Sequence, residues 1–117
     1  MKRLILVIIL LITGCAQKYE ATSGIVKLSC LESGDSSPTT ITLDLDNRAA
    51  NWYLFDTRLS VLATSWSFTF NTTTSISIVE QRQVWNISRK DGSFSQYTLM
   101  AFAGDTKSTD TVYGKCT

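Results

Sequence analysis

The sequence predicts an all-β fold: a small antiparallel meander barrel or sandwich of seven to eight strands, closed by one disulfide. Apolar and polar residues alternate with a period of two, most clearly in "TTITLDLD", where Ile41, Leu43 and Leu45 share one face. Clusters of turn-forming residues separate these short runs. Beyond the N-terminal apolar run, no segment of useful length has the 3.6-residue period of a helix. The 117 residues suffice for one domain.

The strands are expected to follow one another through a single domain, residues 24–117. Alternation around Leu28 predicts the first strand, "ESGDSSP" a loop, and 39–46 the second strand. The stretch 47–63 is expected to be mostly strand, either a hairpin turning near Asp56-Thr57 or a segment with one short helical turn.

Further strands are predicted in the second half of the chain. "SWSFTF" alternates, and Ile76 and Ile78 mark another strand. Lys90-Asp91-Gly92 lies between two alternating runs, which is a strong hairpin signal. Gly104-Asp105 is expected to begin a polar loop, and "TVYGKCT" to form the closing strand. Closure is favoured because an open sheet leaves its edge strands unprotected.

The N-terminus has the layout of an export signal. A basic start, Met1-Lys2-Arg3, precedes nine apolar residues, 4–12. Nine residues are too few for a membrane-spanning helix, which needs about 20, and the layout is that of a secretory signal peptide. A buried N-terminal helix or strand is the alternative.

The signal ends in Ile12-Thr13-Gly14-Cys15, which resembles the lipobox of bacterial lipoproteins. The resemblance implies that residues 1–14 are removed as a signal peptide, that Cys15 carries acyl chains such as palmitate, and that 15–23 form a lipidated tether. Several chains on one residue suffice for stable anchoring in a lipid bilayer. Ala16 stands where an Asp would resemble the inner-membrane retention signal. We therefore expect a lipid anchor on the periplasmic face of the outer membrane.

Removal of the signal peptide would change the formal charge of the chain. Two cysteines besides Cys15 would remain. Without Lys2 and Arg3, nine of the 11 basic residues face ten acidic ones, a formal charge of −1. Such a domain has no electrostatic footprint for nucleic acid. Cys30 and Cys116 are expected to pair in an oxidising compartment. Two reactive thiols are the alternative.

Side chains for catalysis are scarce. The chain has no histidine, so neither a Ser-His-Asp system nor a usual zinc site can form. We expect no enzymatic activity, metal or cofactor. Asp44 and Asp46, two positions apart on a strand, would share a face. They either form an acid–base or cation-binding pair or solubilise the outer face of that strand.

Trp52, Tyr53 and Phe55 are the candidate partner-binding residues. Aromatic side chains dominate interaction hot spots, so a loop carrying them would suit a protein or sugar partner. The alternative is that they fill the core. A filled core with an exposed aromatic loop would favour a binding module, whereas a large apolar cavity would favour a carrier of small apolar ligands.

The layout also resembles small periplasmic lysozyme-inhibitor lipoproteins, in which a lipobox and tether precede an all-β barrel with an early and a late Cys. Ser33-Gly34 lacks the Tyr of that family's Ser-Gly-x-x-Tyr loop, and Asn-Ile-Ser follows Trp85 in place of its x-Lys-Gly, so no inhibitory residues carry over. "WNISRKDGSF…YGKC" is similar to the terminal unit of small secreted bacterial and phage β proteins. The second resemblance implies a fold element rather than an activity, and it is consistent with an accessory lipoprotein that blocks a surface receptor. We expect a non-enzymatic lipoprotein that binds an envelope or invading protein, with an inhibitor or receptor blocker as one version of that role; a structural envelope lipoprotein is a further alternative.

Overall fold

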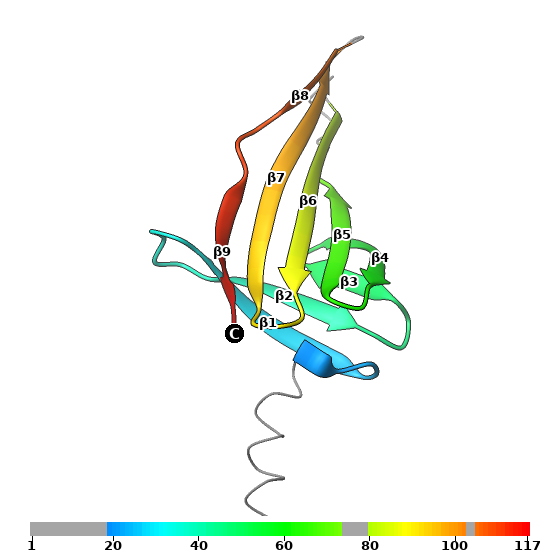
Figure 1. The fold of residues 1–117 in the computed structure, drawn as a ribbon. Coiled ribbons are helices and arrows are strands. Elements are labelled where there is room, and N and C mark those ends of the chain that lie inside the picture. Colours follow the sequence, from blue (N-terminus) through cyan, green and yellow to red (C-terminus); the bar gives the residue numbers. More distant parts are fainter. Residues whose placement is uncertain (1–18, 74–79, 103–104) are drawn as a thin grey trace, which may run out of the picture.

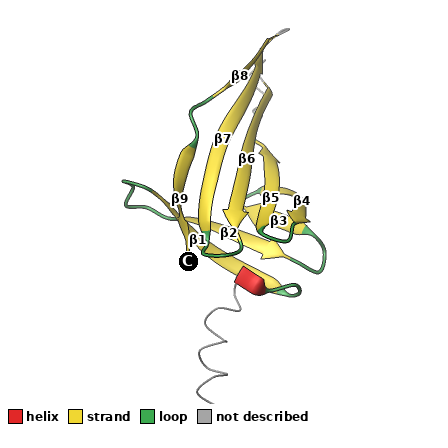
Figure 2. Ribbon diagram, viewed as in Figure 1, coloured by secondary structure: helices red, strands yellow, loops and turns green. Residues whose placement is uncertain are grey.

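The computed structural model describes residues 19–73, 80–102 and 105–117, and these parts of the chain are built almost entirely of β-strands. Tyr19 and Glu20 form a helical turn ahead of the first strand (Figure 2). The strands are β1 Ile25–Glu32, β2 Thr39–Asp44, β3 Ala49–Trp52, β4 Phe55–Val61, β5 Ser65–Asn71, β6 Glu80–Ser88, β7 Ser93–Phe102, β8 Asp105–Ser108 and β9 Val112–Cys116.

Eight of these strands close into an antiparallel barrel. β1 to β7 pair in sequence order, β9 joins β7 to β1, and all of these pairings are antiparallel. β8 lies outside the barrel and pairs with the end of β7. In Figure 1, β7 begins beside the C-terminus at the bottom of the view, and β8 pairs with its far end at the top. The predicted closed all-β fold is confirmed, with one strand more than the barrel needs.

The predicted disulfide is also present. Cys30 and Cys116 are direct register partners on β1 and β9, with Cα atoms 3.9 Å apart. The bond joins residues 86 positions apart, so it constrains most of the unfolded domain.

The barrel interior is filled by the alternate residues that the sequence pattern predicts. Ile41 and Leu43 are fully buried, and the described chain holds no buried polar or charged residue. The largest interior side chains are aromatic: Trp66, Phe68, Phe70, Trp85 and Phe94. The rings of Phe68, Trp85 and Phe94 stack in series, with centroids 5.9 Å and 5.1 Å apart.

Two glycines allow close packing beside this core. Gly92 in the β6–β7 turn has φ 81°, and a Cβ there would collide with the carbonyl oxygen of Cys116. At Gly114 on β9, a Cβ would collide with the carbonyl oxygen of Leu31 and lie 2.5 Å from the Phe94 ring. The antiparallel pairing of β6 and β7, with Ile87 opposite Phe94, confirms the hairpin predicted at Lys90-Asp91-Gly92.

Three expectations differ from the structure or lie beyond it. The turn of the first aromatic hairpin is Tyr53-Leu54, not Asp56-Thr57, because Trp52 pairs with Phe55 and both rings pack on the core. Asp105–Ser108 is a strand and not a loop, because it pairs with the protruding end of β7. The predicted strand at Ile76 and Ile78, the signal and Cys15 lie outside the described residues.

The antiparallel register defines two ends of the barrel. The tether end holds Tyr19, Gly24, the turns 45–48, 62–64 and 89–92, and Thr117. The distal end holds the turns 33–38 and 53–54, the end of β5, the start of β6, and β8. Tyr19, the first described residue, therefore lies at the end opposite the aromatic hairpin.

Candidate functional site

The most exposed large apolar side chains of the described chain form the tip of the β3–β4 hairpin. Tyr53 is 87% exposed and Leu54 is 99% exposed. Single exposed apolar residues are ordinary on protein surfaces, but two adjacent ones at a protruding tip form a contact point. Leu54 was missed by the sequence reasoning, which selected aromatic residues only.

The candidate aromatic cluster is divided between the surface and the core. Trp52 and Phe55 are partly buried against the core, and their rings stack with centroids 5.4 Å apart. Trp52 also contacts Phe70 and Tyr53, at 5.9 Å and 5.5 Å between centroids. Trp52 and Phe55 therefore form a rigid base that holds Tyr53 and Leu54 out into solvent.

The tip has an unusual backbone. Tyr53 has φ 53°, in the left-handed region that bulky residues rarely adopt. Such conformations cost about 1–3 kcal/mol and persist where the surroundings enforce them, often at functional positions. Here the stacked pair below the turn enforces it. A Gly or Asn would adopt this backbone conformation at a lower cost than Tyr.

A hollow of about 140 Å³ lies beside this hairpin in the distal mouth of the barrel. Its walls include the rings of Trp52, Trp85 and Phe94. Its polar lining comes from the carboxylates Glu32 and Asp35, the amides Gln83 and Gln96, and the hydroxyls Ser37 and Thr39. Among the described residues that line it, none is basic.

The larger hollows lie against outward-facing side chains. One of about 350 Å³ includes Asn86, Ser95 and Tyr113, and one of about 500 Å³ includes Leu31 and Lys115. The interior itself is occupied by the aromatic core. These two larger hollows therefore lie outside the filled interior, where a carrier would hold its ligand.

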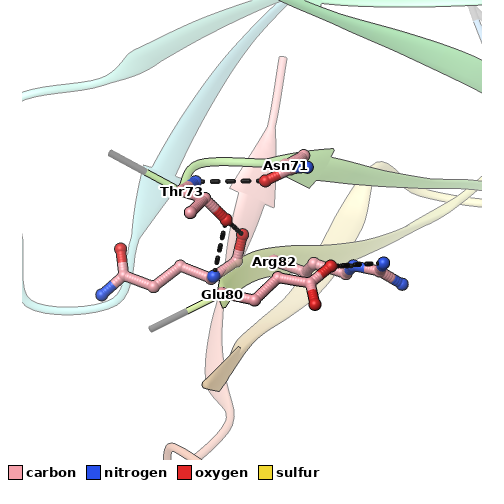
Figure 3. A network of polar contacts seen from close by, with 5 residues as sticks. Asn71, Thr73, Glu80 and Arg82 are labelled. Carbon is pink, nitrogen blue, oxygen red and sulfur yellow. Dashed lines mark hydrogen bonds and ion pairs between the residues drawn. The ribbon is translucent and has the colours of Figure 1, made fainter. Parts of the chain in front are cut away.

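Hydrogen bonds order the rim between β5 and β6 (Figure 3). The Thr73 hydroxyl accepts a bond from the Gln81 amide at 2.9 Å and donates to the Gln81 carbonyl oxygen at 3.3 Å. The Asn71 side-chain oxygen accepts from the Thr73 amide at 3.1 Å. Arg82 donates through Nε to Glu80 Oε1 at 2.9 Å, so its charge is matched on its own strand.

At the opposite end, Arg89 fastens the segment that leads into β1. Its guanidinium donates to the carbonyl oxygens of Tyr19, Glu20, Ala21 and Leu62, at 2.7–3.3 Å. It also lies 5.7 Å from the centre of the Trp66 ring. The tether is thus docked on the barrel from Tyr19 onward.

Charge is distributed unevenly between the two ends. The distal end carries six acidic residues against two basic ones: Glu32, Asp35, Asp56, Glu80, Asp105 and Asp110 against Arg82 and Lys107. The tether end, within the described residues, carries four acidic residues against five basic ones: Glu20, Asp44, Asp46 and Asp91 against Lys27, Arg48, Arg58, Arg89 and Lys90. Lys115 lies between the two ends, in register with both Ser93 and Leu31, and lines the hollow of about 500 Å³ together with Glu32 and Asp35.

The Asp44–Asp46 pair does not share a strand face. β2 ends at Asp44, and Asp46 lies in the following turn. Asp44 accepts hydrogen bonds from the Asn47 side chain and amide, at 2.8 Å and 3.1 Å, and these lower the pKa of its carboxyl group. This geometry is that of a turn stabilised by an Asp side chain, which accounts for Asp44 without catalysis.

Comparisons with protein-family models, curated proteins and solved structures find no significant match to the chain. Within the described ranges, no group of three or more Cys, Asp or Glu side chains is placed to hold a metal ion. No helix of the described part is long and apolar enough to span a membrane.

Proposed function

We propose that this chain is a lipid-anchored, non-enzymatic protein-binding module of the bacterial envelope, and that it contacts its partner through the distal end. The observation that carries the proposal is the combination of an aromatic-filled interior with an exposed Tyr53-Leu54 tip. A filled interior leaves little room for a carried apolar ligand, whose pockets usually span about 300–1,000 Å³. An exposed tyrosine suits the anchor of a protein interface, because tyrosine is enriched among hot-spot residues, and Leu54 adds apolar surface beside it.

The position of the tip relative to the lipobox supports the same function. Cys15 precedes Tyr19 by four residues, a reach of at most about 14 Å. Acylation of Cys15 would therefore hold the tether end close to the bilayer, and the distal end would face away from it. A partner in the periplasm, or one entering it, would meet the Tyr53-Leu54 tip first.

The experiment is a pull-down from crosslinked envelopes with the lipidated protein and matched variants. The test variant is Tyr53→Ser/Leu54→Ser. The control, Tyr113→Ser/Leu62→Ser, makes the same two changes at residues that are 64% and 51% exposed elsewhere on the barrel. Trp52 and Phe55 are left intact because their truncation would damage the core.

We expect a protein that is captured by the wild type and the control and reduced at least about tenfold with the test variant, since hot-spot residues contribute about 2 kcal/mol each. Equal recovery with both variants would overturn the proposed contact surface. Circular dichroism spectra and unfolding midpoints of both variants establish that they remain folded.

A further inference from the structure

We infer that the distal hollow receives one positively charged side chain, a Lys or Arg of the bound protein, while Tyr53 and Leu54 pack on the apolar surface around that residue. The inference rests on the proposed function and names the chemistry of the partner. The occupant of the distal end is then a basic surface of another protein.

The lining of the hollow has the chemistry that a cation requires. Trp52 and Trp85 line the hollow and offer apolar surface to the methylene stem of a Lys or Arg side chain, because Phe68 and Phe94 cover the faces of the Trp85 ring and Phe55 stacks on Trp52. Glu32 and Asp35 add two carboxylates at the mouth, and charge-assisted hydrogen bonds to carboxylates are about twice as strong as neutral ones. The Gln83 side-chain oxygen accepts a 3.4 Å hydrogen bond from the Trp85 indole N–H, and the Gln96 amide nitrogen donates to the Thr98 hydroxyl at 3.4 Å, so both amides are held in place at the wall.

The walls are held in place before any ligand arrives. Trp85 lies between Phe68 and Phe94 in the ring stack, and Trp52 is stacked on Phe55. Gly114 makes room for the Phe94 ring. Little side-chain freedom is therefore lost on binding, which favours affinity.

The volume of the hollow and the charge of the distal end favour one class of occupant. About 140 Å³ fits the head group of one side chain, and falls below the usual range for drug-sized ligands. Arg82, one of the two basic residues at this end, is paired with Glu80 on the rim and does not line the hollow. The acidic excess of the distal end would attract a basic partner over a distance of about a Debye length.

The test follows the indole N–H signals of Trp52 and Trp85 by NMR during titration with N-acetyl-arginine-N-methylamide. Its neutral isostere, N-acetyl-citrulline-N-methylamide, is the control ligand, and fully buried Trp66 is the internal control signal. We expect the arginine probe to shift the Trp52 and Trp85 signals, and to bind at least about tenfold more tightly than the citrulline probe. Equal binding of the two probes, or no shift at either ring, overturns the inference.

Matched variants separate the hollow from the general charge of the distal end. Glu32→Gln/Asp35→Asn should weaken arginine binding about tenfold or more. Asp56→Asn/Asp105→Asn removes the same two charges at the same end but outside the hollow, and should have a much smaller effect. Equal weakening by both pairs would show long-range attraction without a site, and would contradict the inference.

A second probe separates a partner's side chain from a free small cation. The peptide acetyl-Gly-Leu-Arg-Leu-Gly-amide should bind more tightly than the single-residue probe, and Tyr53→Ser/Leu54→Ser should remove that gain. If the tip variant leaves peptide binding unchanged, the site is one for small cations and the partner assignment is wrong. A crosslinked partner that depends on Tyr53 and Leu54 but not on Glu32 and Asp35 would overturn this inference alone and leave the proposed function standing.

Discussion

The hydroxyl group of Tyr19 donates a 2.8 Å hydrogen bond to the carbonyl oxygen of Cys116, 97 residues further along the chain. The bond ties the segment that follows the predicted lipid anchor to the cysteine that closes the barrel. A collision with a Cβ at Gly92 would disturb both partners. The chain from Tyr19 onward and the barrel therefore form one body, so that under the proposed acylation of Cys15 the distal end would point away from the bilayer.

Removing this hydroxyl should destabilise the domain modestly. Tyr19→Phe loses one partly buried hydrogen bond and leaves the Cys116 carbonyl oxygen without that donor, at a cost of about 1 kcal/mol in the free energy of unfolding. Urea denaturation measures the change. Tyr113→Phe, on an exposed ring, is the control and should leave the midpoint unchanged. Equal midpoints for the two variants would show that the Tyr19 bond contributes nothing.

Replacement of Arg89 by lysine should lower the stability of the domain. Lysine keeps the charge but has no planar fork of donors, so it cannot serve four carbonyl oxygens and cover the Trp66 ring together. We expect Arg89→Lys to lower the free energy of unfolding by about 2 kcal/mol. The same change at exposed Arg82 should cost less than about 1 kcal/mol. A wild-type unfolding curve for Arg89→Lys would contradict this account of the docked tether.

The disulfide should supply a large part of the stability. Closing a loop of 86 residues is worth about 4–5 kcal/mol in the chain-entropy model. Cys30→Ala/Cys116→Ala should lose most of this in a denaturation experiment, and dithiothreitol should shift the wild type but not the variant. If dithiothreitol also shifted the unfolding of the variant, its effect on the wild type would not be due to the disulfide.

Gly114 and Gly34 should respond differently to alanine. A methyl group at Gly114 meets the Leu31 carbonyl oxygen and the Phe94 ring, so overpacking should cost up to about 3 kcal/mol. At Gly34 nothing lies within 4 Å, and only the left-handed backbone, φ 86°, opposes a side chain. That penalty is about 1–2 kcal/mol. Thermal unfolding of the two variants should rank them in this order, and the reverse order would mean that β9 can move away from Phe94.

Low pH should lower the stability of the turn that contains Asp91 at the tether end. The Ser93 amide and hydroxyl donate to Asp91 at 2.9 Å and 2.7 Å, and these bonds hold the Asp91 pKa below its ordinary value of 3.8. A lowered folded-state pKa adds stability that is present above 3.8 and is lost as the pH falls through the folded value. Asp91→Asn should therefore make the fall in melting temperature below pH 3.8 shallower. An unchanged slope would remove Asp91 from the acid response.

The fold could be predicted because its residues obey a period of two. Ile41, Leu43 and Leu45 alternate in the sequence and are buried together in the structure. Cys30 and Cys116 are the only cysteines besides Cys15, for which lipidation was predicted, so the prediction of their pairing needed no geometry.

The aromatic turn was misplaced because polar residues were taken as the turn signal. The inward positions are Ala50 and Trp52 on β3, then Phe55, Thr57 and Leu59 on β4. The inward residues have even numbers on β3 and odd numbers on β4. This change from even to odd between Trp52 and Phe55 is the sequence signal of the two-residue turn. The distal hollow was beyond prediction, because its carboxylates and rings come from separate strands and loops.

The most direct test of the central claim is photocrosslinking in cells, with a photoreactive residue placed once at Leu54 and once at Leu62. Both leucines are exposed, but Leu54 lies at the distal tip and Leu62 in a turn at the tether end. The account predicts a discrete protein adduct from position 54 and none from position 62. Adducts from position 62 alone, or the same adducts from both positions, would contradict a partner surface at the distal end.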